Sequence, residues 1–216
     1  MKALRSMLFV SALLLASSSA ASAQVTQKNM KFLSGGSTVF HGVYVGPYLG
    51  QIVSDPGQPT IDIFCVDYKN DVFIGSTWTA NFSPLGGDLS LTRFNNVTRY
   101  QQAAWLSKQF GTHAKSEWGN IDYAIWNITT PGTPSIGVAS GGLTGQYWLT
   151  QAGMSSNYSS VNLADWTVVT DVNTHNGVGG IQEYLTPNVV PEPATVLLLG
   201  SGILGLGLVG FFKRNV

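Results

Sequence analysis

The sequence predicts an α+β fold: an antiparallel β-sheet or sandwich core interrupted by a two-helix insertion, with an N-terminal signal helix and a C-terminal transmembrane helix. β-branched and aromatic residues gather between turn-forming residues in 25–82 and again in 145–185. Between these regions, in 97–128, apolar residues recur every three or four positions, which indicates amphipathic helices. Each end of the chain carries a separate apolar run. These patterns divide the 216 residues into a signal segment, one core domain and a tail.

Residues 1–23 have the layout of a secretory signal peptide. Lys2 and Arg5 precede a short apolar segment, and small residues follow it up to Ala21 and Ala23. We therefore expect cleavage after Ala23 and export of the remaining chain. The alternative, an N-terminal membrane anchor, is disfavoured because the apolar segment is too short to cross a bilayer.

The first part of the core is predicted to form strands separated by turns. Residues 38–45 are β-branched and aromatic, and 55–59 contain the proline and glycine of a turn. Residues 61–67 and 77–82 are predicted strands, and 72–74 are predicted to start a partner strand.

Two helices are predicted in the middle of the core. The first covers 97–110, because Asn95-Asn96 are good N-cap residues and Gly111 is placed to end the helix. The second begins near Ser116 and lines up apolar side chains on one face in 118–128. Together they would form a helical hairpin that covers a sheet.

Strand patterns return after the helices. Residues 145–150 and 165–171 are predicted strands, 155–160 a polar loop between them, and 181–185 a closing strand. No internal repeat is present, so we assign 24–186 to one extracytoplasmic core domain.

The tail, residues 187–216, contains an uncharged apolar run at 194–212. A helix of this length extends roughly 28 Å, enough to cross the hydrocarbon core of a bilayer. Lys213 and Arg214 follow the run and favour a cytoplasmic end. The sequence therefore predicts a transmembrane helix at the C-terminus.

Pro191, Glu192 and Pro193 form a stiff, extended tripeptide just before this run. With the glycine-rich helix and the basic end, they resemble the PEP-CTERM sorting domain of Gram-negative bacteria. The resemblance implies retention in the inner membrane, processing near the tripeptide by exosortase, and then a place on the cell surface or in the extracellular matrix. It also implies association with exopolysaccharide and biofilm. A permanent tail anchor is the alternative.

Three short motifs of the core resemble thioester domains of surface adhesins: 64–67 (FCVD), 103–106 (AAWL) and 124–126 (AIW). In those domains a cysteine forms a thioester with a glutamine, and the bond acylates a target surface. The matching positions here hold Cys65 and Asp122. Aspartate has no amide to lose as ammonia, so we expect this pair to be inactive. Cys65 is the only cysteine, so the chain has no internal disulfide.

Charge and motifs exclude several other functions. Residues 24–186 hold seven basic and ten acidic residues, a net charge of −3, which argues against nucleic acid as a partner. His41, His113 and His175 lack zinc-ligand spacing, and Asp67 and Asp71 lack the spacing of an EF-hand. No nucleophile-elbow, metalloprotease or P-loop motif occurs. We therefore expect no metal, no cofactor and no enzyme.

These observations predict an exported, non-enzymatic adhesive or structural protein whose partners are exosortase, the inner membrane and possibly exopolysaccharide. One rival is a secreted glycan-binding module, for which the six tryptophans are candidates. They are Trp78, Trp105, Trp118, Trp126, Trp148 and Trp166. The other rival is a polysaccharide hydrolase, which needs two carboxylates in a cleft. The plausible ones are Asp88, Glu117, Asp122 and Asp165.

Overall fold

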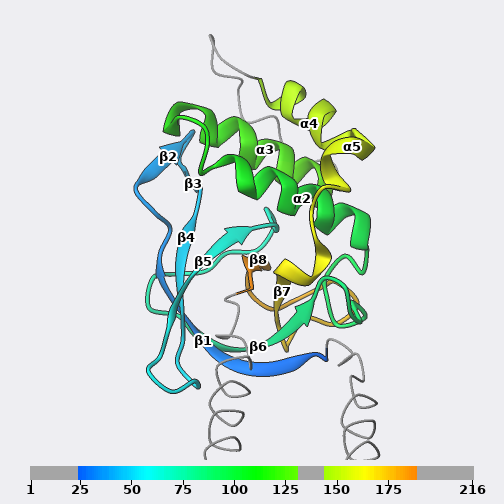
Figure 1. Cartoon of the computed structure of the whole chain (residues 1–216). Helices are drawn as coiled ribbons and strands as arrows, with labels where there is room; N and C mark the ends of the chain where they lie inside the picture. The colour runs from blue at the N-terminus through cyan, green and yellow to red at the C-terminus, as the bar shows by residue number, and fades with distance from the viewer. Residues whose placement is uncertain (1–23, 131–143, 189–216) are drawn as a thin grey trace, which may run out of the picture.

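The computed structural model describes residues 24–130 and 144–188. Six antiparallel strands close into a barrel in the order β1-β4-β5-β8-β7-β6 (Figure 1). The strands are β1 Thr26–Ser34, β4 Tyr48–Ile52, β5 Thr60–Cys65, β6 Thr77–Pro84, β7 Trp166–Asp171 and β8 Tyr184–Pro187. The predicted mixture of helices with an antiparallel sheet is confirmed, and the sheet closes on itself rather than forming a sandwich.

The long first strand, β1, closes the barrel by pairing on both of its edges. Met30 lies opposite Ile52 of β4 and opposite Trp78 of β6. The interior is tightly filled at this level, because a Cβ added to Gly50 would lie 2.9 Å from the Met30 methyl group and 3.2 Å from Ile63 Cδ1. The barrel is therefore a packed core, as expected for so few strands.

A layer of helices covers one end of the barrel (Figure 1). The α-helices are α2 Val97–Gln109, α3 Trp118–Thr129, α4 Gly145–Gly153 and α5 Ser155–Tyr158. Two short 3-10 helices, η1 Lys115–Glu117 and η2 Leu163–Asp165, precede α3 and β7. The first predicted helix is confirmed with its cap: the Asn96 side chain accepts a hydrogen bond of 3.0 Å from the Arg99 backbone N–H.

The predicted strand at 38–45 is a separate hairpin of β2 Thr38–Phe40 and β3 Val43–Val45. His41 and Gly42 turn the chain with positive φ angles of 49° and 87°. The hairpin packs on α3, where the ring of Phe40 comes so close to Gly119 that an added Cβ would lie 2.2 Å from it. A glycine in α3 thus lets the hairpin reach the helix.

The predicted strand at 145–150 is wrong, because these residues belong to α4. The Thr144 side chain caps this helix by accepting a hydrogen bond of 3.1 Å from the Tyr147 backbone N–H. Trp148 and Ala152, four residues apart, then point to the same side and are buried. The burial of one helical face has overridden the strand preference of the aromatic residues. The region between β6 and β7, predicted as a two-helix insertion, therefore holds more than two helices.

In 24–130 and 144–188, no helix has both the length and the apolar character needed to span a bilayer. The predicted signal helix and the predicted transmembrane helix at 194–212 lie outside these residues. So do the predicted cleavage, sorting and stop residues Ala21, Ala23, Pro191, Glu192, Pro193, Lys213 and Arg214.

Candidate functional site

Cys65, the first position of the thioester resemblance, is a buried thiol. It ends β5, is 1% exposed, and its Sγ donates a weak hydrogen bond of 3.3 Å to the Asp67 carbonyl oxygen. Burial raises the pKa of the Cys65 thiol far above its ordinary value, and the nearby Asp122 carboxyl raises it further. The thiol therefore stays protonated, and a protonated thiol is a poor nucleophile.

Asp122, the second position, comes from α3 and is also buried. Its Oδ2 accepts a hydrogen bond of 2.6 Å from the Gly46 backbone N–H, while Oδ1 has no hydrogen-bond partner among the described residues. Burial raises the pKa of the Asp122 carboxyl well above its usual value. The fold thus brings the two side chains into one buried region, where the Asp122 carboxyl raises the pKa of the Cys65 thiol.

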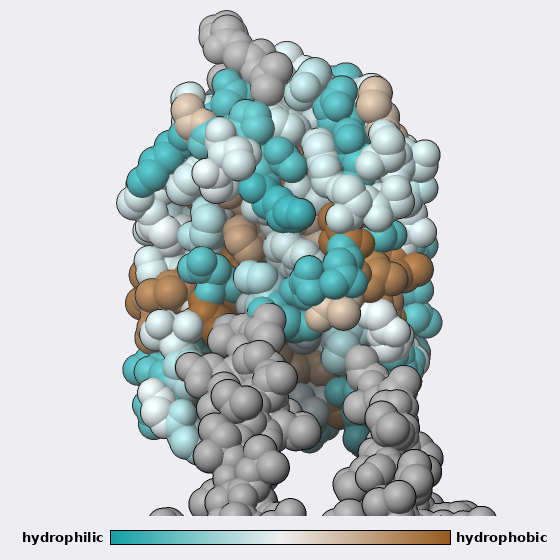
Figure 2. Space-filling model, viewed as in Figure 1, coloured by the Kyte–Doolittle hydropathy of each residue, from teal (hydrophilic) through white to brown (hydrophobic). Residues whose placement is uncertain are grey.

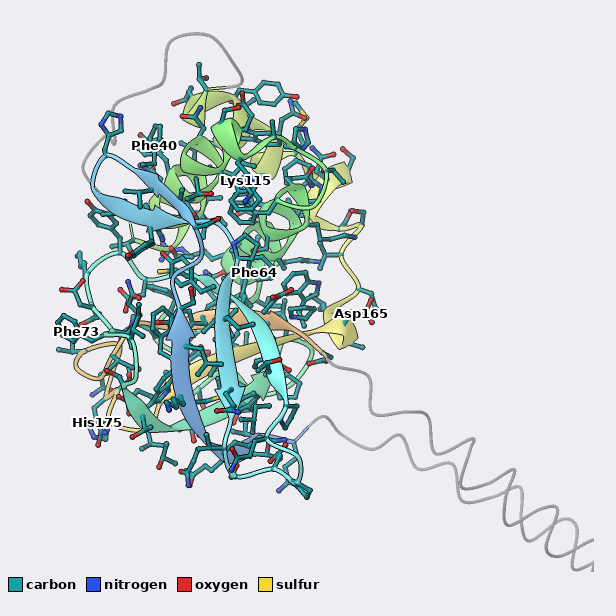
Figure 3. The ribbon with its side chains drawn as sticks, turned by 90° about the vertical axis from the view of Figure 1, so that its left-hand side faces the viewer. Phe40, Phe64, Phe73, Lys115, Asp165 and His175 are labelled. Carbon is teal, nitrogen blue, oxygen red and sulfur yellow. The ribbon has the colours of Figure 1, made fainter. Side chains whose placement is uncertain are left out.

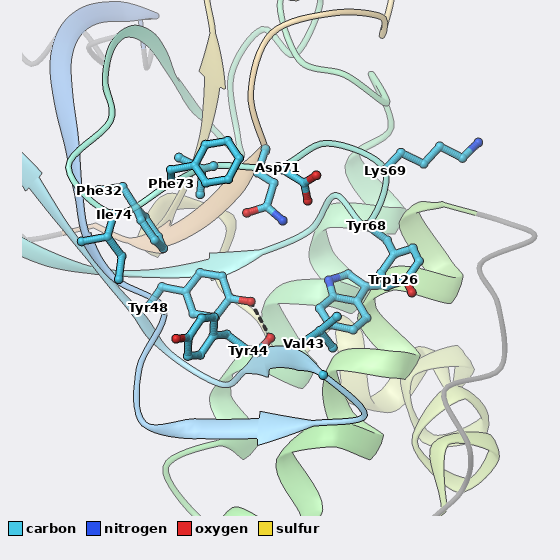
Figure 4. Close-up of a pocket in the computed structure, with 14 residues that line it drawn as sticks. Phe32, Val43, Tyr44, Tyr48, Tyr68, Lys69, Asp71, Phe73, Ile74 and Trp126 are labelled. Carbon is cyan, nitrogen blue, oxygen red and sulfur yellow. Dashed lines mark hydrogen bonds between the residues drawn. The ribbon is translucent and has the colours of Figure 1, made fainter.

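An open groove of about 710 Å³ lies on the surface next to this pair (Figure 4). The end of β1, the β2–β3 hairpin, the loop after β5, helix α3 and Gln182 form the groove. Its aromatic residues are Phe32, Tyr44, Tyr48, Tyr68, Phe73 and Trp126. Lys69, Asp71 and Gln182 supply the polar side chains of the groove. Trp126 connects the groove to the buried pair, because the Trp126 side chain also interacts with the Cys65 thiol.

The groove has a buried floor and exposed walls. Phe32, Tyr48 and Trp126 are almost fully buried, whereas Tyr44 and Phe73 are 49% and 76% exposed. Exposed aromatic side chains that line one groove often mark an interaction site. On the face that Figure 2 shows, hydrophobic patches lie at the level where the barrel meets the helices, among mostly hydrophilic or neutral residues.

Backbone hydrogen bonds hold the loop that carries Phe73. The Gly75 N–H donates to the Phe32 carbonyl at 2.8 Å, and the Phe32 N–H donates to the Ser76 carbonyl at 2.9 Å. The Ser76 N–H also donates to the Phe73 carbonyl at 2.9 Å. The predicted strand at 72–74 does not form, because these bonds tie the segment to β1 as a turn. These backbone hydrogen bonds hold the wall of the groove against β1.

A buried ion pair anchors the other end of the same loop. Arg93 Nε lies 3.0 Å from Asp67 Oδ2, and the Asp67 carboxylate also accepts hydrogen bonds from the Lys69 N–H at 3.0 Å and the Asn70 amide at 2.7 Å. The Arg93 guanidinium donates as well to the carbonyl oxygens of Gly177, Gly179 and Ile181. One arginine thus positions two sides of the groove, the loop after β5 and the chain leading to Gln182.

The residues proposed for the two rival functions do not gather in a site. Trp78, Trp148 and Trp166 are all buried, at 8%, 2% and 6% exposure, which counts against a sugar-binding platform made of tryptophans. Asp165 lies on the opposite side of the molecule from Phe73 (Figure 3). Asp88 is exposed and serves a turn, accepting a hydrogen bond of 2.8 Å from the Ser90 N–H.

Among the described residues, no group of three or more His, Cys, Asp or Glu side chains is placed to hold a metal ion. The groove itself was not predicted from the sequence. The signal was present in Val72-Phe73-Ile74, an apolar run next to the polar stretch 68–71, but this pattern also fits a buried strand.

Comparisons with protein-family models, with curated proteins and with solved structures found no match for this chain. The site is therefore interpreted from its own geometry: an aromatic groove at the surface and, next to it, a buried thiol and a buried carboxyl.

Proposed function

We propose that this chain is an exported, membrane-tethered protein of the bacterial cell surface or extracellular matrix, whose core binds its partner without covalent chemistry. The observation that carries this proposal is the preformed groove with exposed Phe73, Ile74 and Tyr44 beside an inert Cys65–Asp122 pair. A rigid surface site loses little conformational entropy on binding, which suits an adhesive or structural module.

The absence of reactive groups around the groove supports a non-enzymatic role. Asp71 is the one carboxylate among the residues that line the groove in the described part of the chain. A glycosidase needs two carboxyl groups across the bond that it cleaves. Acyl transfer would need a thioester, and a carboxyl at position 122 would have to lose water rather than ammonia to form one.

Placement of the protein is proposed from the sequence. The signal peptide would direct export, and the helix at 194–212 would hold the chain in the inner membrane with Lys213 and Arg214 on the cytoplasmic side. Exosortase would then process the chain near Pro191-Glu192-Pro193 and pass it to the cell surface or matrix. The mildly acidic core would stay outside the cytoplasm.

Intact mass spectrometry of the protein from its native host tests both parts of this proposal. We expect a chain that starts at Gln24, ends near the Pro191-Glu192-Pro193 segment and shows no hydroxylamine-sensitive loss of water or ammonia. Hydroxylamine, which cleaves thioesters, should leave the mass unchanged. A chain that retains residues 1–23 would contradict export, and a hydroxylamine-sensitive mass loss would contradict non-covalent binding. A mature chain that still ends at Val216 would support the permanent anchor instead of sorting.

A further inference from the structure

We infer that the groove binds an uncharged polysaccharide chain, with sugar rings packed on Tyr44 and Phe73 and their hydroxyl groups held by Asp71 and Gln182. This inference rests on the proposed function, because it names the partner of the same surface site. Of the six tryptophans that the sequence brought forward, Trp126 lines the groove, and the exposed aromatic residues there are Tyr44 and Phe73.

The aromatic side chains suit the flat faces of sugar rings. A pyranose ring presents C–H groups on its faces and hydroxyl groups around its edge, so it packs on aromatic surface while its edge needs polar partners. Tyr44 and Phe73 lie on opposite walls of the groove with much of their surface exposed, and Trp126 lies deeper (Figure 4). A site lined mainly by aromatic side chains with a few polar groups is typical of small-molecule and sugar recognition.

The charge of the groove favours neither an acidic nor a basic ligand. Lys69 and Asp71 both line it, so its charged side chains cancel (Figure 4). The Asp71 carboxylate and the Gln182 amide can accept hydrogen bonds from hydroxyl groups, and the Lys69 ammonium can donate to them. A uronic-acid polymer, a phosphate group or an acidic peptide would find no excess of positive charge there.

An extended peptide is less well accommodated than a sugar chain. The only strand that borders the groove with a free edge in the described part is β3, which pairs with β2 on its other side. A peptide that adds to such an edge needs its backbone carbonyls as acceptors. The Tyr44 carbonyl on this edge already accepts a hydrogen bond of 2.7 Å from the Tyr48 hydroxyl, so a peptide strand would have to share or displace this contact.

The size and openness of the groove agree with a polymer. Its volume of about 710 Å³ falls within the range of ordinary ligand sites, roughly 300 to 1,000 Å³. The groove is open at the surface, so a long chain could lie in it with only a few of its rings in contact.

Binding of neutral hexasaccharides of glucose, galactose and mannose to the full chain in detergent micelles tests the inference. Titration calorimetry should show binding of at least one of them and no binding of a hexasaccharide of uronic acid. Phe73→Ser should weaken that binding about tenfold, as expected for loss of an aromatic contact with the ligand. The matched control is Val178→Ser, since Val178 is 73% exposed and does not line the groove; it should bind like the unchanged chain.

Three results would overturn the inference: no binding of any neutral hexasaccharide, tighter binding of the uronic-acid hexasaccharide or of an extended peptide, or equal effects of Phe73→Ser and Val178→Ser. The proposed function is judged separately, by the processed mass of the chain from its host. An exported and processed chain that binds no sugar would leave the proposed function standing without this partner. A chain that is not exported would contradict the proposed function whatever it binds.

Discussion

Glu183 and Asp122 are both fully buried carboxyl groups, but they differ in how many partners they have. Glu183 accepts three hydrogen bonds, from the Arg93 N–H at 2.7 Å and from the hydroxyl groups of Thr170 and Tyr100, each at 2.6 Å. Asp122 accepts one, from Gly46, and its Oδ1 has none among the described residues. The barrel thus uses Glu183 as the centre of a structural network, whereas nothing in the fold requires a carboxyl group at position 122.

Removal of the Glu183 carboxyl should give the largest effect. Glu183→Ala would leave the Arg93 backbone N–H and the hydroxyl groups of Thr170 and Tyr100 buried without their acceptor. We expect a loss of about 3 to 5 kcal/mol in the free energy of unfolding, measured by urea denaturation of the full chain in micelles. Glu183→Gln keeps an acceptor oxygen and should lose clearly less. Equal losses in the two variants would show that the network matters only through its volume.

The second effect is a pH dependence that comes from the same group. Burial raises the pKa of Glu183 from 4.5 to about 7, although its three hydrogen bonds and Arg93 oppose the shift. Between these values the unfolded chain releases the proton first, so stability is fully present below pH 4.5 and is lost as the pH rises through 7. The loss should reach about 3 kcal/mol.

The measurement for this second prediction is the stability of the unchanged chain and of Glu183→Gln at several pH values from 4.5 to 8. The difference between the two chains should shrink as the pH rises, because only the unchanged chain carries the titrating group. A constant difference across this range would contradict the prediction.

The third effect concerns Asp122 and should be smaller and of opposite sign. Asp122→Asn keeps the oxygen that accepts from Gly46 and removes a group that is costly to ionise in its buried site. We expect a gain of about 1 kcal/mol at pH 8 and almost no change at pH 4, where the carboxyl is protonated in the folded chain. A loss of stability at pH 8 would show that the carboxylate does have a partner that the fold depends on.

How much of the fold the sequence could predict depends on whether an element is determined by local or by distant contacts. The helix after Asn96 and the strands at 61–67, 77–82 and 165–171 depend on neighbouring residues, and each was located to within a few residues. The helix α4 was missed because Gly145-Gln146-Tyr147-Trp148 is as rich in aromatic residues as a strand, and its helical state depends on packing against α3. Pattern alone does not register such packing.

The candidate site was predictable only in part, for the same reason. The three motifs of the thioester resemblance placed Cys65 and Asp122 together, and the structure brings them into one buried region. The groove joins residues from Phe32 to Gln182, and the arginine that positions it bonds to Glu183, 90 residues away. Contacts between residues so far apart in the sequence leave no local pattern. The roles of Arg93 and Phe73 at the groove could therefore be assigned only from the structure.

The smallest effect on stability is expected at the groove, and it sharpens the contrast with the buried network. Phe73→Ser removes a side chain that is 76% exposed and rests on a turn held by backbone hydrogen bonds, so the free energy of unfolding should change by less than about 0.5 kcal/mol. Urea denaturation beside Val178→Ser measures this directly, since both substitutions remove a similarly exposed apolar side chain. A loss of more than about 2 kcal/mol at Phe73 alone would assign the residue to the core. An unchanged stability means that the fold gains nothing from this aromatic ring, which leaves the ring free to contact a ligand.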